Sequence, residues 1–347
     1  MCLQKAGLLC LLLLLLSTAA DAKIVFSSRH DGGLYGIYVM DDDGSNITPL
    51  TESETLRPCC PTWSSDGQQI LFKRRAKRNA NYVLFLMNAD GTNIRQLTEN
   101  DGSSINGGRF SPDGTSIVFG RTYRKNDELK GGIYVLNIQT GKMEQISDIW
   151  GIQCDWSPDG KQIVFALGQT IGVNSTIWIM GADGHNPRPL LPAPGPGEFA
   201  TYRSRTRWSP DGKQIVFQQK EYKYVSIPND GNFPVYKAFR YIVCDRNGGN
   251  IRQLRIPKDW EGYGIDWMED GESIVFGAYV GIPLNKPLPR GFVYPPCNIY
   301  KYHIWTGEIT RLTNHPGTDG TLDWISDDVL SVSPQGKKKV RWGALKK

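Results

Sequence analysis

The sequence predicts an all-β protein, a six-bladed β-propeller whose blades are four-stranded antiparallel sheets. The first indication is a repeat, because WSPDGKQIVF occurs at residues 156–165 and again, unchanged, at residues 208–217. Looser or decayed copies begin at Trp63, Phe110, Trp267 and Trp324. The turn aspartates of successive copies lie 46 to 59 residues apart. This period is typical of propellers and solenoids, in which one repeat cannot bury its own apolar face.

The second indication is that each copy has the pattern of two strands joined by a tight turn. Ser-Pro-Asp-Gly suits a type I turn, with Ser at the first position, Pro at the second and Gly at the fourth. The segment before the turn ends on an aromatic residue. The segment after it, such as residues 162–166 (QIVFA), is β-branched and aromatic, as strands prefer.

A third and a fourth strand complete each unit. Third strands are expected at residues 36–41, 82–88, 132–137, 176–181, 240–245 and 298–303. Each leads through a polar turn such as Asp90-Gly91 into a short fourth strand, because glycine accepts the positive φ that such hairpin turns need. No stretch after residue 22 has a convincing helical period.

The two ends of the chain are expected to share one blade. Residues 23–28 (KIVFSS) match the second strand of a repeat with no first strand before it, and residues 320–326 (GTLDWIS) match a first strand with no third or fourth strand after it. We therefore expect residues 321–326 to pair with residues 23–28, which closes the ring and removes exposed sheet edges. Residues 330–347 are expected to form a C-terminal tail.

One aromatic residue recurs at the same place in every unit and is expected to pack as a wedge between blades. Each such side chain buries about 150–250 Å². The six blade wedges are Trp63, Phe110, Trp156, Trp208, Trp267 and Trp324.

These turns and strands resemble the repeats of the TolB-type β-propeller family, over residues 23 to about 327. The shared mark is an aromatic-Ser-Pro-Asp-Gly-Lys turn followed by an Ile-Val-Phe strand. The founding member of that family has an α/β domain ahead of its propeller and works in the bacterial periplasm with envelope and outer-membrane lipoproteins. We expect an isolated propeller here, without that domain.

Residues 1–22 are expected to be a cleaved signal peptide, which predicts a periplasmic or secreted protein. They contain one lysine, an apolar run over residues 8–16 and a final Ala-Asp-Ala. That run is too short to span a bilayer, and no other transmembrane segment is expected. Residues 23–347 are expected to form a single domain. Its formal net charge of +5 does not indicate a nucleic-acid partner, and a monomer is expected.

No enzyme motif stands out, so catalysis is not favoured and no catalytic residue, metal site or cofactor is predicted. The sequence lacks G-x-S-x-G, H-E-x-x-H, P-loop and dinucleotide-binding patterns. Five cysteines follow residue 22, without metal-ligand spacing or the density of a disulfide framework. The adjacent Cys59-Cys60 pair is interpreted as packing, with redox chemistry as the alternative, and one long-range disulfide bridge is left open.

A polar residue precedes each blade wedge and is expected to face the centre of the ring, because side chains alternate along a strand. The central-channel candidates are Arg109, Asp155, Arg207, Asp266 and Asp323. Charges of both signs favour pairing within or between blades. The alternative is that the three aspartates line a polar channel for a cation or a ligand.

Recognition is expected at the long-loop end of the ring, opposite the short-turn end that carries the Ser-Pro-Asp-Gly and Asp-Gly turns. Residues 221–237 and 278–297 are expected to be long loops there, and long loops on a rigid scaffold often carry binding residues. The aromatic anchor candidates are Tyr222, Tyr224, Phe233, Tyr236, Tyr279, Phe292 and Tyr294. The basic candidates at the same end are Arg74, Arg75, Arg78, Arg124, Arg203 and Arg205.

These features favour a scaffold that binds a protein partner in the periplasm or cell envelope. A basic rim also suits an acidic glycan or a lipid headgroup. The alternative function is therefore a carbohydrate-active propeller, a lyase or binding protein for acidic sugars, that uses the basic rim and the central channel. A merely solvated basic rim is left open as well.

Overall fold

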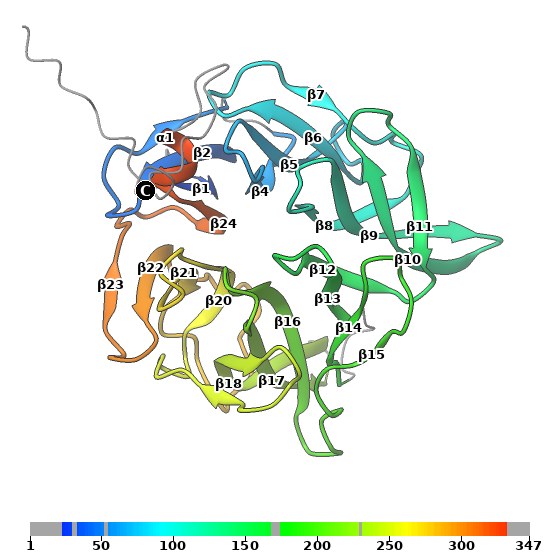
Figure 1. The fold of residues 1–347 in the computed structure, drawn as a ribbon. Coiled ribbons are helices and arrows are strands. Elements are labelled where there is room, and N and C mark those ends of the chain that lie inside the picture. The colour runs from blue at the N-terminus through cyan, green and yellow to red at the C-terminus, as the bar shows by residue number, and fades with distance from the viewer. Residues whose placement is uncertain (1–22, 30–32, 52–54, 168–173, 229–230, 332–347) are drawn as a thin grey trace, which may run out of the picture.

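The structure is a computed structural model that describes residues 23–29, 33–51, 55–167, 174–228 and 231–331. These residues form six four-stranded antiparallel sheets arranged as blades around a central axis (Figure 1). The first strand of each blade lies nearest the axis (Figure 1). The predicted six-bladed propeller is confirmed.

The first half of the ring comprises three blades. Blade 1 contains β24 (Asp319–Ile325), β1 (Lys23–Ser28), β2 (Gly36–Asp41) and β3 (Thr48–Pro49). Blade 2 contains β4 (Cys59–Trp63), β5 (Gln69–Arg75), β6 (Tyr82–Asn88) and β7 (Arg95–Gln96). Blade 3 contains β8 (Ser104–Phe110), β9 (Ser116–Lys125), β10 (Glu128–Asn137) and β11 (Met143–Ser147).

The second half has the same plan. Blade 4 contains β12 (Gly151–Trp156), β13 (Gln162–Leu167), β14 (Ile177–Gly181) and β15 (Arg188–Pro189). Blade 5 contains β16 (Ala200–Trp208), β17 (Gln214–Ile227), β18 (Gly231–Asp245) and β19 (Arg252–Gln253). Blade 6 contains β20 (Glu261–Trp267), β21 (Ser273–Tyr279), β22 (Cys297–His303) and β23 (Ile309–Arg311).

The two ends of the chain close the ring in blade 1, as the sequence predicts. Strand β1 pairs with β24 in an antiparallel register that places Lys23 opposite Ile325 and Ser28 opposite Asp319. Strand β24 is thus the inner strand that the N-terminal hairpin lacks, and every blade has four strands.

A short helix, and not the weak turn suggested by Asp327-Asp328, follows β24. Helix α1 (Asp327–Ser331) begins at these two aspartates. Asp327 matches the turn Asp of the repeat, whereas Ser326 and Asp328 stand where the repeat has Pro and Gly. Val329 and Leu330 pack against the apolar cluster around Trp63. In the part of the chain that the structure describes, no helix is long and apolar enough to cross a membrane. The predicted signal peptide and residues 332–347 of the predicted tail lie outside the described residues.

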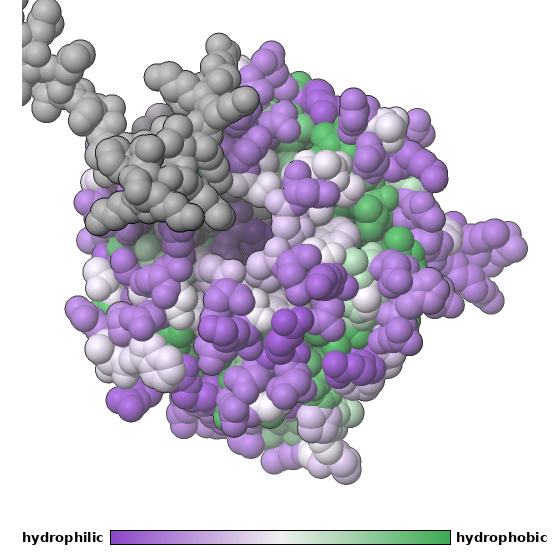
Figure 2. Space-filling model, viewed as in Figure 1, coloured by the Kyte–Doolittle hydropathy of each residue, from purple (hydrophilic) through white to green (hydrophobic). Residues whose placement is uncertain are grey.

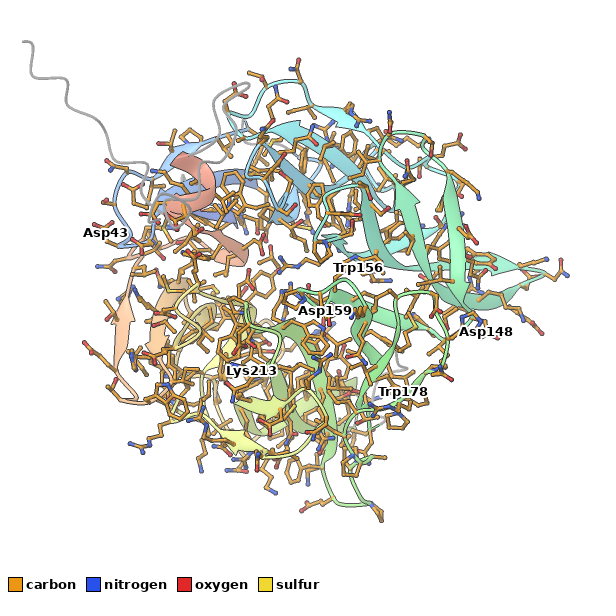
Figure 3. All side chains as sticks on the ribbon, viewed as in Figure 1. Asp43, Asp148, Trp156, Asp159, Trp178 and Lys213 are labelled. Carbon is orange, nitrogen blue, oxygen red and sulfur yellow. The ribbon has the colours of Figure 1, made fainter. Side chains whose placement is uncertain are left out.

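Each blade wedge lies in an apolar cluster shared by two neighbouring blades. Trp63, for example, packs with Val25 and Ile37 of blade 1 and with Phe72 of its own blade. Trp208 packs in the same way against Val164 and other residues of blade 4. Trp156 and Asp159 lie toward the middle of the ring, whereas Asp43 and Asp148 lie at its periphery (Figure 3). Burial of these aromatic rings holds adjacent sheets together.

The Ser-Pro-Asp-Gly segments, and the Ser-Ser-Asp-Gly segment that stands in their place in blade 2, form the expected tight turns. In blade 2 the Gly67 amide donates to the Ser64 carbonyl at 2.9 Å, and the Ser64 hydroxyl donates to the Asp66 carboxylate at 2.6 Å. The serine hydroxyl also accepts from the amide of Gln69 at 2.9 Å. The turn residues are therefore occupied with local backbone hydrogen bonds, as in ST and Asx motifs.

One predicted long loop is instead a β-hairpin. Residues 221–237 belong mostly to β17 and β18, which pair as far as Ile227 and Gly231. The hairpin extends beyond the blade because its apolar side is covered by residues 280–296, a long loop as expected. Isolated bridges join Val235 to Pro287 and Tyr236 to Leu284. A two-stranded hairpin is only marginally stable by itself, and packing of residues 280–296 on its apolar side provides the missing stabilisation.

Candidate functional site

A belt of five charged side chains crosses the centre of the ring. The charged belt consists of Arg109, Asp155, Arg207, Asp266 and Asp323. Arg109 forms an ion pair with Asp323, and its guanidinium nitrogens lie 3.8 Å from Asp266 and 3.9 Å from Asp155. The structure therefore brings the central-channel candidates together, and Arg109 pairs with the aspartates. Arg207 instead donates to the backbone carbonyl of Thr206 at 2.7 Å.

The three aspartates of the belt also connect neighbouring blades. Each accepts a hydrogen bond from the backbone amide of the wedge tryptophan in the next blade. The pairs are Asp323 with Trp63 at 2.6 Å, Asp155 with Trp208 at 2.9 Å and Asp266 with Trp324 at 3.2 Å. The aspartate that precedes a wedge thus provides the hydrogen-bond acceptor for the backbone amide of the wedge in the neighbouring blade.

Burial raises the pKa of Asp323 well above its usual value, and the nearby Asp266 carboxylate adds to this, while Arg109 offsets only part. Burial acts on Asp266 too, but Arg109 and a hydrogen bond from Asp323 outweigh it and lower its pKa. Burial also raises the pKa of Asp155, against the charges of Arg109 and Arg207. Three carboxylates face two guanidinium groups, so one proton held by the Asp266–Asp323 pair neutralises the belt.

A ring of β-bulges lies on the long-loop side of the belt. In each blade the pairing between the inner strand and the second strand contains a register shift. The shift falls at the residue three positions before the wedge, or at the residue next to it. The bulge ring consists of Cys60, Gly107, Gln153, Arg205, Gly264 and Thr321, and all six residues line a central cavity of about 120 Å³. Bulges re-aim side chains in this way near functional sites.

The backbone of the bulge ring adopts the left-handed region at several positions that are not glycine. The φ values are 56° at Cys60, 53° at Gln153, 58° at Arg205 and 24° at Thr321. Such conformations cost about 1–3 kcal/mol each and concentrate at functional sites. Hydrogen bonds stabilise them, because the Cys60 amide donates to Thr321 at 2.9 Å and the Arg205 amide donates to Gln153 at 2.6 Å. This ring was not predicted from the sequence. It could have been found there, because each of its residues lies three positions before a blade wedge.

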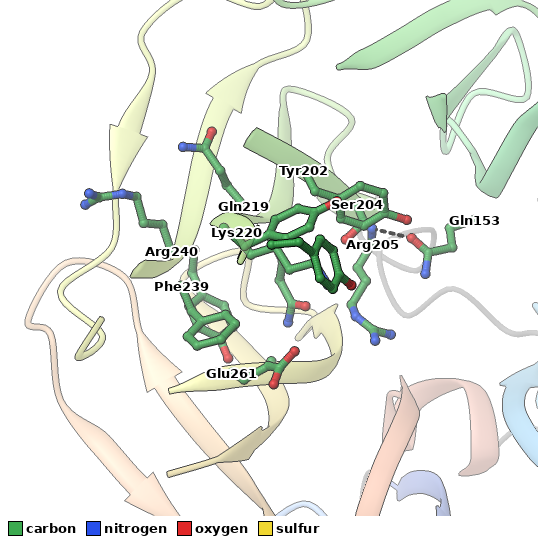
Figure 4. Close-up of a pocket in the computed structure, with 14 residues that line it drawn as sticks. Gln153, Tyr202, Ser204, Arg205, Gln219, Lys220, Phe239, Arg240 and Glu261 are labelled. Atoms are coloured by element: carbon green, nitrogen blue, oxygen red, sulfur yellow. Dashed lines mark hydrogen bonds between the residues drawn. The ribbon is translucent and has the colours of Figure 1, made fainter. Parts of the chain in front are cut away.

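A second cavity, the side pocket, lies between blades 5 and 6 and has a volume of about 350 Å³. Gln153 and Arg205 line both the side pocket and the central cavity. It is surrounded by Tyr202 and Arg205 of β16, Lys220 of β17 and Glu261 of β20 (Figure 4). Arg205 was predicted from the sequence, whereas Lys220 and Glu261 were not, because nothing in their local pattern marks them.

The side pocket holds two oppositely charged groups that do not pair directly. Lys220 lies over the rings of Tyr202 and Tyr222 at 5.2 and 5.1 Å, and among the described residues it has no carboxylate within 4 Å. Burial lowers the pKa of Lys220 and raises that of Glu261. One carboxylate oxygen of Glu261 is buried without a hydrogen-bond partner among the described residues. A polar ligand would satisfy both groups.

The aromatic anchor candidates lie close together, but most of them are buried or partly buried beneath the protein surface. Tyr222, Phe233 and Tyr236 are buried, and Tyr279 and Phe292 are partly buried. They form the aromatic platform, in which the hairpin of β17 and β18 packs on residues 280–296 through Ile282 and Leu288. The hairpin buries these rings because it covers the loop, which the sequence pattern did not reveal.

The exposed part of the aromatic platform is apolar. Tyr224 and Tyr294 are 44% and 39% exposed. Sequence analysis missed two further exposed apolar residues there, Ile227 at 38% and Val293 at 85%. Val293 could have been found from the sequence, because it lies between Phe292 and Tyr294, two of the predicted anchors. In contrast, most of the molecular surface visible in Figure 2 is hydrophilic.

The basic candidates do not form one patch. Arg74 stacks over Phe85 at 4.2 Å, and Arg203 donates to Gln219 and to the Pro192 carbonyl at 3.0 and 2.9 Å. Arg75 lies 5.5 Å from the ring of Tyr82, and Arg78 and Arg124 are exposed. Arg205 lines both the side pocket and the central cavity.

The cavity on the short-turn side of the belt is lined by most of the wedges and has a volume of about 340 Å³. In the described part of the chain, no three His, Cys, Asp or Glu side chains are placed to hold a metal ion. His315 lies 2.6 Å from both carboxylate oxygens of Asp319 and is paired there.

Comparisons with known proteins agree on the fold. A family model described as the TolB beta propeller domain matches residues 17–230 and 71–278. A comparison with curated sequences found no match. TolB from Acinetobacter baumannii is a similar solved structure, with a TM-score of 0.65 and 17% identity over 87% of this chain. The match covers 66% of that TolB chain, so this chain spans somewhat less than two thirds of its length.

Two further solved structures share the architecture. An oligogalacturonate lyase in complex with manganese has a TM-score of 0.56 and 16% identity, over 86% of this chain and 75% of its own. A chain of a nidogen/laminin complex has a TM-score of 0.60 and 10% identity, over 88% and 98%. At these identities the likeness concerns the fold.

Proposed function

The chain belongs to the TolB β-propeller family, and on that basis we propose that it is an exported scaffold of the periplasm or cell envelope that binds a protein partner at its long-loop end. The observation that carries the proposal is the exposed apolar top of the aromatic platform. Aromatic side chains on a rigid base are effective anchors, because little side-chain freedom remains to be lost on binding.

The platform is rigid for identifiable reasons. Tyr294 packs edge-on against Tyr279 and Phe292, with ring centroids 5.1 Å apart in both pairs. Tyr224 packs against Tyr222 at 5.8 Å. The two exposed rings are therefore held from below by the buried ring of Tyr222 and the partly buried rings of Tyr279 and Phe292.

The chemistry around the platform indicates the kind of partner segment. Tyr224 belongs both to the platform and to the lining of the side pocket, which contains Arg205 and Lys220. A segment with apolar residues would cover Tyr224, Val293 and Tyr294, and an acidic side chain beside them would reach the two cations. Acidic charge on the partner would also speed association with a chain of formal net charge +5.

Affinity capture from an envelope extract tests this function. Wild type and a Tyr224→Ala/Tyr294→Ala double variant are compared, and Trp305→Ala serves as the control because Trp305 is 57% exposed after β22, at the short-turn end. We expect a specific partner with wild type and the control, and affinity lower by more than about tenfold with the double variant. Equal capture by all three proteins contradicts the proposal.

A second candidate function is supported by the side pocket. Its cations, tyrosines and unsatisfied Glu261 oxygen suit the carboxylate and hydroxyl groups of an acidic sugar. The oligogalacturonate lyase shares the fold. Calorimetric binding of galacturonate oligomers to wild type, with loss of binding in Lys220→Gln, would favour this function. Formation of an unsaturated product with added manganese would make it a lyase.

A further inference from the structure

Cys59 and Cys60 lie together for a reason specific to the bulge of blade 2. Adjacent residues of a regular strand point to opposite faces. The register of β4 shifts between Cys59 and Thr62, and Cys60 has a φ of 56°. The alternation is broken there, and the two Sγ atoms lie 3.7 Å apart. The equivalent bulge positions of the other blades hold no cysteine.

The pair lies beside two cations at the central cavity. Cys59 is directly opposite Lys73 in the sheet register. Cys60, Lys73 and Arg205 all line the cavity of about 120 Å³. Lys73 is held by a hydrogen bond to the Ile105 carbonyl at 3.4 Å and lies over the Tyr82 ring at 5.3 Å. Cations next to a thiol favour the thiolate, which is the reactive form of cysteine.

Protonation separates this pair from the other cysteines. A hydrogen bond from Cys59, with the charges of Lys73 and Arg205, lowers the pKa of Cys60 well below its ordinary value despite burial. The hydrogen bond to Cys60 and burial raise the pKa of Cys59. Cys154, Cys244 and Cys297 are fully buried, and burial raises their pKa values.

We propose that Cys59 and Cys60 form a redox-active vicinal dithiol at the central cavity, which reduces small disulfides and is itself oxidised to a Cys59–Cys60 disulfide. The Cys60 thiolate attacks one sulfur of the small disulfide, forms a mixed disulfide and releases one thiolate. The Cys59 thiol then attacks the Cys60 sulfur, expels the second small thiol and gives that thiol its proton. Two protein sulfurs are oxidised and one disulfide becomes one thiol and one thiolate.

The geometry also predicts that the oxidised form is readily reduced. The two sulfur atoms must approach from 3.7 Å to about 2.05 Å within a ring that contains only one peptide bond. Strained disulfides have higher reduction potentials. Oxidation also consumes the Cys60 thiolate, so the positive charge of Lys73 then faces the cavity without its nearest negative charge.

The test is oxidation of the native full chain at pH 7 with hydroxyethyl disulfide, followed by alkylation and peptide mass spectrometry. Wild type should lose two thiols, with one peptide containing residues 59 and 60 lighter by two hydrogens and without adduct. Cys59→Ala should stop at a mixed disulfide on Cys60. Cys60→Ala should not react, because the central cavity is lined by Cys60 and not by Cys59.

A second measurement compares the alkylation rates of individual cysteines. In native wild type, Cys60 should be alkylated by iodoacetamide at least about tenfold faster at pH 7 than Cys59 or any of the three buried cysteines. Lys73→Met should move the pH profile of this alkylation to higher pH. Equal reactivity of the five cysteines that follow residue 22, or loss of no thiol in wild type, overturns the proposal.

Discussion

Replacing Asp323 with alanine should be among the most damaging single changes in the channel. The change removes the ion pair with Arg109 and leaves the Trp63 amide without the carboxylate that accepts it at 2.6 Å. Removing one partner of a buried pair costs about 3–5 kcal/mol. Arg109 keeps Asp266 and Asp155 at 3.8 and 3.9 Å, so we expect a loss near the lower end, about 3 kcal/mol.

Asparagine at the same position should be tolerated better, and the difference should depend on pH. The asparagine oxygen can still accept from the Trp63 amide. The raised pKa of Asp323 means that the folded state holds its proton more tightly than the unfolded state. Wild type therefore loses stability as pH rises from about 4 through the folded pKa, and Asp323→Asn does not. The gap between the two proteins should narrow over that window.

Urea unfolding followed by tryptophan fluorescence between pH 4 and pH 8 measures these differences. Asp148→Ala serves as the control, because Asp148 is an exposed carboxylate at the edge of the ring (Figure 3). We expect it to change the free energy of unfolding by less than about 0.5 kcal/mol. The reasoning is refuted if Asp323→Ala is as stable as wild type, or if alanine and asparagine are equally destabilising at every pH.

Three further predictions concern the ring and its processing. Deleting residues 319–331 should abolish cooperative thermal unfolding measured by circular dichroism, because β24 is the inner strand of blade 1; an unchanged melting curve would show that the ring closes otherwise. Gly91→Ala should lower stability by about 1–3 kcal/mol, because φ is 84° and a Cβ would collide with the Leu50 carbonyl. Gly141→Ala, with a φ of 70° and open space, should cost less, and an equal loss in denaturant titrations would rule out the collision. Mass spectrometry of the exported protein should find Lys23 at the N-terminus, whereas an intact leader in the cytoplasm would contradict export.

Local sequence was sufficient for the propeller because its devices act over short distances. Ser-Pro-Asp-Gly forms its turn through hydrogen bonds within a few residues, as at Ser157 and Gly160. The wedges and the strand patterns repeat with the blades, so blade number and ring closure follow from counting. The channel residues were also found, because alternation along a strand places the residue before each wedge toward the centre.

Only the tertiary structure determined which of the predicted site residues are exposed and which are buried. Tyr222, Phe233 and Tyr236 are buried because two segments of different blades cover each other, and no local pattern records that contact. The position of a bulge depends on pairing with the next strand, so the sequence did not reveal that Cys59 and Cys60 face the same side. Turns and alternation are local consequences of covalent geometry, whereas burial and charge pairing arise only when distant segments meet.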